Sequence, residues 1–128
     1  MSESDSQWPL RLVIPGLPRG KGRPRFGKGR VYTPAKTKEY ENTIAWAAKA
    51  AMGRRKMLTG PVRLTITCVF SSKERGWHVS KPDLDNCVKS ATDGMTGIIY
   101  KDDAQICYMN VSKINGLTDE VEIYVRPL

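Results

Sequence analysis

The sequence predicts one α+β domain, in which a small mixed β-sheet carries two main helices. Three observations indicate this class. The chain has 128 residues, which suits one compact domain with a single core, and 40% of them are hydrophobic. Apolar residues recur at helical spacing in two segments and alternate with polar residues in four others. We expect residues 1–128 to fold as this single domain, with residues 1–9 as a flexible N-terminal tail.

The first half of the chain predicts a strand, an arm and a helix. Residues 10–15 alternate in polarity and stop at a proline, which is typical of a strand. Residues 16–30 are rich in glycine, proline and basic side chains and predict a flexible arm, followed by a short strand at residues 31–32. We expect a helix to start at Thr33-Pro34, with an N-cap and then proline at the first helical position, and to end at Gly53. Its apolar stripe consists of Tyr40, Ile44, Ala47, Ala48 and Ala51.

The second half predicts three strands and one helix. Residues 61–70 alternate in polarity and are rich in β-branched side chains, which is the strongest strand signal in the chain. A second helix is expected from Asp83 to Met95. Residues 105–113 and 119–126 predict two more strands, with Asn115-Gly116 in the turn between them. The apolar face of the second helix consists of Leu84, Cys87, Val88, Ala91 and Met95.

Basic residues concentrate in the first half. Residues 1–60 carry 13 Lys and Arg against four Asp and Glu, whereas residues 61–128 carry eight against nine. Residues 19–30 contain no acid, and their six cations, the arm cations, are Arg19, Lys21, Arg23, Arg25, Lys28 and Arg30. Charge this concentrated usually serves a polyanionic partner such as nucleic acid. The alternative is a solvated loop that raises solubility.

Several function classes are disfavoured by composition. There is no run of 18 apolar residues and the N-terminus is acidic and polar, so we expect a cytosolic protein with no membrane partner. The three cysteines, at positions 68, 87 and 107, form no CxxC pair and predict neither a disulfide framework nor a zinc site. The one histidine, His78, is expected to be a surface residue. Hydrolytic chemistry in this chain would therefore use carboxylates and a metal ion.

Two pairs of acids stand near predicted element ends. Asp83 and Asp85 begin the second helix, and Asp102 and Asp103 precede the next strand. If both turns lie at one end of the sheet, the carboxylates come together, and such a cluster needs protons or a cation between them. Mg²⁺ suits carboxylate oxygens, water and substrate phosphate oxygens, and Mn²⁺ also favours oxygen ligands. The alternative is that the acids only cap helices and form turns.

Lys89 lies four residues after Asp85 and therefore on the same helix face. Its ammonium could stabilise the phosphate in the transition state or the leaving 3′ oxygen. The alternative is an ordinary i, i+4 salt bridge between the two side chains.

Two segments resemble the RusA family of Holliday junction resolvases. They are Lys81-Pro82-Asp83-Leu84-Asp85-Asn86, with Lys89 beyond it, and Tyr100-Lys101-Asp102-Asp103-Ala104-Gln105. The arm from Pro18 to Phe26, followed by Val31-Tyr32-Thr33-Pro34, is similar to the N-terminal segment of phage-type members. The likeness runs from about Leu10 to Val125.

The resemblance implies a RusA-like fold and a homodimeric, Mg²⁺-dependent endonuclease without an organic cofactor. Such an enzyme makes paired symmetric nicks in four-way DNA junctions during recombination and repair, in the cytosol and nucleoid of a bacterium or with a prophage as its source. One-step hydrolysis by metal-activated water would leave 5′-phosphate and 3′-hydroxyl ends. A C2 dimer supplies one active site for each of the two strands that must be cut.

The resemblance also assigns site residues. Asp83, Asp85 and Asp103 match the metal-binding catalytic acids, Lys89 matches the catalytic lysine, and Asp102 is a supporting acid at the metal. Asp93 also has a counterpart in the family, and it is either structural or a support behind the residues that contact the metal. The arm cations and Lys81 are expected to bind DNA phosphates, which gives affinity and salt dependence without sequence information. Trp77 either stacks on an unpaired base or serves as a packing or dimer contact.

Two other functions fit the same residues. A metal-dependent nuclease acting on flaps, replication forks or plain duplex would need the same cleavage residues. A non-catalytic DNA-binding protein would use the arm alone, and Asp85→Asn would then leave every DNA-dependent activity intact.

Overall fold

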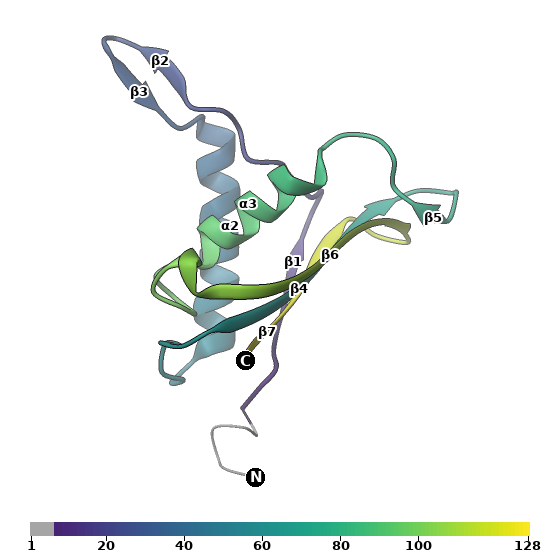
Figure 1. Ribbon diagram of the computed structural model, residues 1–128. Helices are drawn as coiled ribbons and strands as arrows, with labels where there is room; N and C mark the ends of the chain where they lie inside the picture. Colours follow the sequence, from purple (N-terminus) through teal and green to yellow (C-terminus); the bar gives the residue numbers. More distant parts are fainter. Residues whose placement is uncertain (1–6) are drawn as a thin grey trace.

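The computed structural model describes residues 7–128 and shows a five-stranded mixed sheet with two helices over one face (Figure 1). The sheet strands are β1 (Leu10–Pro15), β4 (Val62–Ser71), β5 (Gly76–Trp77), β6 (Ile106–Gly116) and β7 (Glu120–Pro127), and the helices are α2 (Ala35–Met52) and α3 (Leu84–Met95). The spatial order is β1-β7-β4-β6-β5, in which β4 and β6 are parallel and the other neighbours antiparallel. The predicted α+β class and mixed sheet are confirmed.

The central strand β4 organises the core. Its side chains alternate between buried and half-buried, as its sequence predicts, and its inward positions are fully buried. The inward positions of β1 and β7 continue this apolar face towards the helices. Trp8 also packs against the core, so the predicted tail is shorter than residues 1–9, and its first six residues lie outside the described part of the chain.

The two last strands do not form the predicted hairpin. β6 and β7 lie on opposite sides of β4, so their connection crosses over the end of that strand. Asn115 and Gly116 belong to β6, where they pair with Phe70 and Ser71 of β4. A side chain at Gly116 would meet Val69 at 2.4 Å, so glycine is needed here for close packing rather than for a turn.

Helix α2 carries the apolar stripe that its sequence predicts. Ile44 and Ala48 are buried, and Tyr40, Ala47 and Ala51 pack against the core. Gly53 ends the helix with φ 53°, as predicted. The start differs by one residue, because Pro34 has an extended backbone (ψ 142°) and takes the N-cap position predicted for Thr33.

Helices α2 and α3 approach closely. A side chain at Gly94 of α3 would meet Ile44 of α2 at 2.6 Å, so the contact depends on glycine. The buried thiol of Cys87 in α3 neighbours that of Cys68 in β4, and this neighbour together with burial raises the pKa of the Cys68 thiol. Beyond α3, the buried Tyr100 hydroxyl donates to the Thr92 carbonyl at 3.0 Å. Helix α3 is thus held by α2, by the sheet and by its own following loop.

The basic arm is more ordered than predicted. Residues 25–32 form a hairpin of β2 (Arg25–Gly27) and β3 (Arg30–Tyr32) that projects from the domain beyond α2 (Figure 1). Lys28 and Gly29 form its two-residue turn with φ 52° and 77°, as a type I′ turn requires. This turn joins the paired residues Gly27 and Arg30. Its Lys-Gly dipeptide is the hairpin signal that the sequence analysis missed. No helix within residues 7–128 is long and apolar enough to cross a membrane.

Candidate active site and nucleic-acid interface

The first acid pair stands at the start of α3. Asp83 occupies the N-cap position, but its side chain makes no capping hydrogen bond. It accepts instead from the Lys81 ammonium at 2.9 Å, and this hydrogen bond holds the pKa of the Asp83 carboxyl below its usual range. Asp85 lies exposed in the first turn, where the helix dipole favours a negative charge. The capping alternative therefore does not account for the Asp83 side chain.

The second acid pair is held by a capping box around the short 3₁₀ helix η1 (Asp103–Gln105). The Asp102 side chain accepts from the Ala104 N–H at 2.9 Å, and this bond lowers the pKa of the Asp102 carboxyl. Gln105 accepts from the N–H groups of Lys101 and Asp102 at 2.9 and 3.0 Å. Its amide also donates to the carbonyls of residues 58 and 60, which ties the turn to the segment just before β4. Asp102 is thus engaged in shaping the turn that carries Asp103.

Lys89 lies between acids that the chain brings from two places. Its ammonium is 3.3 Å from Asp93 Oδ1, one turn further along α3, and 3.7 Å from Asp103 Oδ2. The Lys89 side chain is 55% exposed, so it remains accessible to a ligand. The i, i+4 partner of Lys89 in the structure is therefore Asp93, and no ion pair to Asp85 forms.

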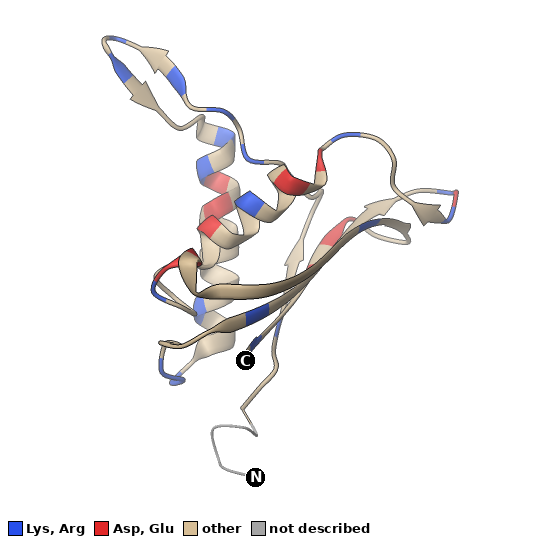
Figure 2. Ribbon diagram, viewed as in Figure 1, with Lys and Arg blue, Asp and Glu red and all other residues tan. Residues whose placement is uncertain are grey.

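Asp83 and Asp85 lie at the start of α3, and Asp103 lies beside Lys89 of the same helix. That the two acid pairs meet at one ion stays a prediction. Figure 2 shows acidic segments at the start of α3 and in the loop beyond its end. Among the described residues, no three His, Cys, Asp or Glu side chains lie close enough to hold one ion. In the structure Asp83 is paired with Lys81 and Asp103 with Lys89, and Asp102 accepts from the Ala104 N–H group.

The donor chemistry nevertheless fits a divalent cation. The predicted ligands are all carboxylates, which are the hard oxygen donors that Mg²⁺ and Mn²⁺ prefer. The side chains of Asp83 and Asp103 are 52% and 46% exposed, so both can turn towards an ion without unpacking the core. The residues that could hold such an ion are Asp83, Asp85 and Asp103, with Asp102 next to them.

The loop before α3 is braced by residues to which the sequence analysis gave no role at the site. The His78 ring is stacked on Phe70, and its Nδ1 lies 2.8 Å from Asn115 Oδ1. The prediction of a plain surface histidine is therefore wrong. The Lys113 ammonium donates to the carbonyls of Ser80 and Pro82 at 2.8 and 2.7 Å. A lysine at an inward position of β6 was the available signal, because a charge on that face needs partners.

Five of the six arm cations are exposed along the arm and hairpin: Arg19, Arg23, Arg25, Lys28 and Arg30 (Figure 2). Lys81, on the loop before α3, is exposed too. The sixth arm cation, Lys21, points inwards and pairs with Glu41 of α2 and Asp93 of α3. This placement does not fit the predicted contact of Lys21 with DNA, because its ammonium already has two carboxylate partners.

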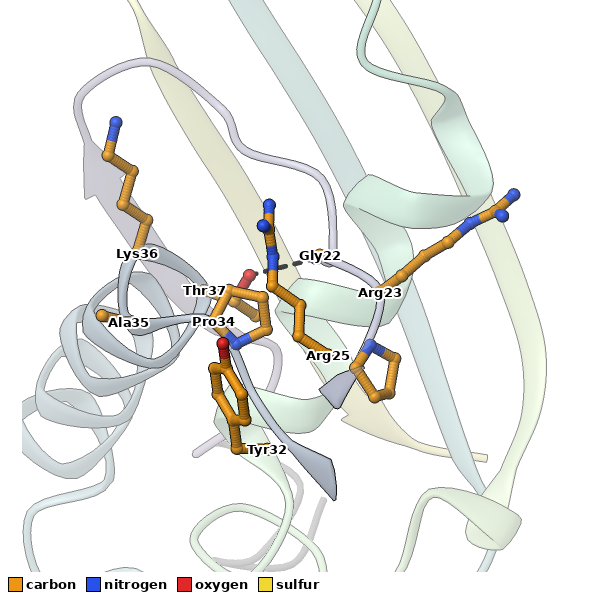
Figure 3. A pocket seen from close by; sticks show the side chains of 9 residues that line it. Gly22, Arg23, Arg25, Tyr32, Pro34, Ala35, Lys36 and Thr37 are labelled. Atoms are coloured by element: carbon orange, nitrogen blue, oxygen red, sulfur yellow. Dashed lines mark hydrogen bonds between the residues drawn. The ribbon is translucent and has the colours of Figure 1, made fainter. Parts of the chain in front are cut away.

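A pocket at the base of the hairpin collects basic side chains. Figure 3 shows Arg23, Arg25 and Lys36 around it, together with Tyr32, while the Gly22 N–H donates to Thr37 Oγ1 at 3.1 Å. A second pocket, between the arm and the loop before α3, is lined by Arg19, Lys36 and Lys81 among others. Lys36 therefore faces both pockets, although the sequence analysis did not select it.

A signal for Lys36 was present in the sequence. Lysine in the first turn of a helix opposes the helix dipole, and the first turn of α2 contains no acid that would compensate. Such a choice is favourable where an anion approaches the helix start. Trp77 is 73% exposed, so within this chain it is not a packing residue.

Comparison with known proteins decides what this chain is related to. The family model described as Endodeoxyribonuclease RusA matches residues 15–126. The chain belongs to the RusA family. The predicted resemblance is confirmed, and with it the class of enzyme, a nuclease that hydrolyses phosphodiester bonds in DNA. RusA-family nucleases generally depend on a divalent metal ion.

Two relatives extend the comparison. The chain is 32% identical to the Bacillus subtilis (strain 168) protein YqaN, which is uncharacterized, over 136 aligned positions that cover 91% of this chain and 95% of YqaN. It is 34% identical over 70 residues to a crossover junction endodeoxyribonuclease rusA of Lactococcus phage r1t. That match covers 51% of this chain and 53% of the phage protein.

Proposed function

We propose that this RusA-family chain resolves four-way DNA junctions by Mg²⁺-dependent paired nicking. The observation that carries the proposal is the position of Lys89 on α3. Its accessible ammonium lies 3.7 Å from Asp103 Oδ2, and the same helix presents Asp85. The basic hairpin projects beyond the start of α2 with one basic pocket at its base, and a second basic pocket lies between the arm and the loop before α3. These features would offer a surface for DNA. The phage relative, named a crossover junction endodeoxyribonuclease, supports the junction as substrate.

In the reaction, water attacks phosphorus and the bond from phosphorus to the 3′ oxygen breaks. The products carry 5′-phosphate and 3′-hydroxyl ends. Asp83, Asp85 and Asp103 would hold the divalent ion, which when bound activates water and screens the charge that develops at phosphorus. Lys89 would place its ammonium against a phosphate oxygen or the leaving 3′ oxygen, where negative charge grows in the transition state. The capping role of Asp102 favours Asp103 over Asp102 as the main ligand.

DNA binding would use the exposed arm cations together with Lys36 and Lys81. Their ammonium and guanidinium groups contact phosphates, which positions the duplex arms without reading sequence. The exposed Phe26 and Tyr32 of the hairpin add apolar surface to this basic ribbon. Trp77 is exposed enough to stack on a base at the crossover.

Productive resolution needs two strands cut at related points of a two-fold symmetric junction. A C2 homodimer meets this need with one active site from each subunit. We therefore include dimer formation in the proposal.

The test places the purified protein with Mg²⁺ on a four-way junction with a mobile core and on a linear duplex of the same sequence. We expect symmetric nicks that ligase can reseal, on the junction only. Asp85→Asn should abolish cleavage and keep junction binding, whereas Glu74→Gln, which removes a carboxylate from an exposed loop, should cut normally. Cleavage of duplex or flaps with equal efficiency would contradict the junction as substrate. Binding without cleavage by the wild type in Mg²⁺ or Mn²⁺ would leave a non-catalytic DNA-binding protein.

A further inference from the structure

Lys21 connects the basic arm to the helix that carries Lys89. Its backbone N–H donates to the Asn86 carbonyl of α3 at 3.0 Å. Its ammonium is paired with Glu41 of α2 and lies 3.0 Å from Asp93 Oδ2 of α3. The Lys21 side chain is only 23% exposed, and its contact with two carboxylates raises its pKa although burial alone would lower it. The residue therefore fastens the arm to both helices as a charged side chain.

Asp93 is shared between two lysines. Its Oδ2 contacts Lys21, and its Oδ1 lies 3.3 Å from the Lys89 ammonium. Asp93 is 22% exposed, about as little as Lys21, whereas Lys89 is more than half exposed. The ion pairs thus form a series from Glu41 through Lys21 and Asp93 to Lys89, and this series ends at Asp103.

The series limits where the Lys89 ammonium can lie. A lysine side chain has four rotatable methylene groups and loses much rotamer freedom when it is held in one place. Asp93 can hold Lys89 only if its own carboxylate keeps one orientation, and Lys21 binds the other oxygen of that carboxylate. Without Lys21, Asp93 would be free to turn, and Lys89 would lose its fixed anchor.

We propose that Lys21 and Asp93 are positioning residues for cleavage: Lys21 orients Asp93, and Asp93 holds the Lys89 ammonium towards Asp103. Through Lys21, docking of the arm on α3 is coupled to the placement of the lysine that faces the phosphate. This inference rests on the proposed function, in which Lys89 acts on the scissile phosphate.

The test separates the cleavage step from DNA binding. For Lys21→Met we expect kcat on the junction to fall about 10- to 100-fold, because small misplacements of a reacting group have effects of this size. The Kd for the junction and its salt dependence should stay close to the wild-type values. Lys28→Met, at the exposed hairpin turn, should do the reverse: weaker binding, a salt slope flatter by about 1, and kcat retained at saturating enzyme.

Further variants distinguish positioning from a general structural role. Asp93→Asn should lower kcat as Lys21→Met does, and the double variant should lose little more, because both act through Lys89. Lys21→Arg should restore part of kcat. Melting temperatures show whether each variant is folded, and the ¹H–¹⁵N signal of the Lys89 ammonium reports its order without DNA. We expect that signal to broaden in Lys21→Met.

Two outcomes would overturn the inference: a wild-type kcat in Lys21→Met, whether or not the salt slope becomes flatter, or a sharp Lys89 signal in the variant. Multiplicative losses in the double variant would also contradict it. Failure of the proposed function is recognised separately, because the wild type itself would then not cut the junction while Asp85→Asn would behave like the wild type.

Discussion

At the residue scale, the two adjacent acids of the second pair have different surroundings. Asp102 binds backbone and completes a capping box, whereas Asp103 faces the Lys89 ammonium. Gln105 supports both by fixing the turn to the carbonyls of residues 58 and 60. Of these two neighbouring aspartates, Asp102 thus stabilises the turn and Asp103 is held by the turn beside Lys89.

The capping role of Asp102 predicts a pH dependence. Its pKa is lowered from 3.8 because the charged form accepts from the Ala104 N–H, so this contribution to stability is complete above pH 3.8 and is lost as pH falls through the lower folded value. The Ala104 amide shift, followed by NMR during acid titration, should show a midpoint below 3.8. In Asp102→Asn this transition should vanish, since an amide still accepts the hydrogen bond but does not titrate. A midpoint at or above 3.8 would mean that the cap does not form in solution.

At the element scale, the β2–β3 hairpin holds part of the basic arm in a defined conformation. Strand pairing places Arg25 opposite Tyr32, and the two-residue turn Lys28-Gly29 closes the hairpin at its tip. The hairpin base meets the start of α2, where Lys36 joins Arg23 and Arg25 around one pocket. Arg23, Arg25 and Lys36 therefore line one pocket, and Figure 3 shows the charged ends of Arg23 and Lys36 pointing to opposite sides of it.

The hairpin predicts a salt-dependent contribution to binding. Changing Arg23 and Arg25 to Ala together should weaken junction binding and flatten the plot of log K against log salt by about 2, one for each phosphate that the variant no longer neutralises. The matched control, Lys49→Ala with Arg54→Ala, removes the same charge at the far end of α2 and should leave the slope nearly unchanged. An unchanged slope in the hairpin variant, measured by titration at several salt concentrations, would mean that the hairpin is a solvated loop without a role in binding.

At the scale of the whole molecule, the sheet leaves one face uncovered by helices. The outward positions of β4 are half-buried, and Arg63 lies 4.7 Å from the Tyr108 ring on that face. The basic hairpin, the acids of α3 and the loop before α3 lie with the two helices rather than on the uncovered face of the sheet (Figure 2). One subunit would thus carry one set of the proposed cleavage residues, which suits one nick per subunit in the proposed dimer.

The proposed dimer predicts the behaviour of mixed subunits. In a dimer of one wild-type and one Asp85→Asn subunit, purified through two different tags, the wild-type site should still nick one strand. The junction should therefore be nicked once but not resolved, as denaturing and native gels would show. Full resolution by the mixed dimer, or a monomeric mass in analytical ultracentrifugation with full activity, would contradict one site per subunit.

Much of the fold follows from local patterns in the sequence. Alternation at β4 and helical spacing in α2 and α3 identify which side of each element is apolar, because burial requires one face whatever the partner is. The motif around Asp83 and the pair at Asp102-Asp103 likewise identify the family without any coordinates. These properties are carried by residues close together in the chain.

Only the tertiary structure decided which distant residues meet. Strand order depends on pairing across the sheet, so Asn115-Gly116 reads locally as a turn although β4 holds it in a strand. The same holds for charges: Lys21 resembles its neighbours in the arm, but Glu41 and Asp93 draw it inwards from 20 or more positions away. Ion pairs and strand pairs form between surfaces that folding brings together, and a local pattern does not specify the partner.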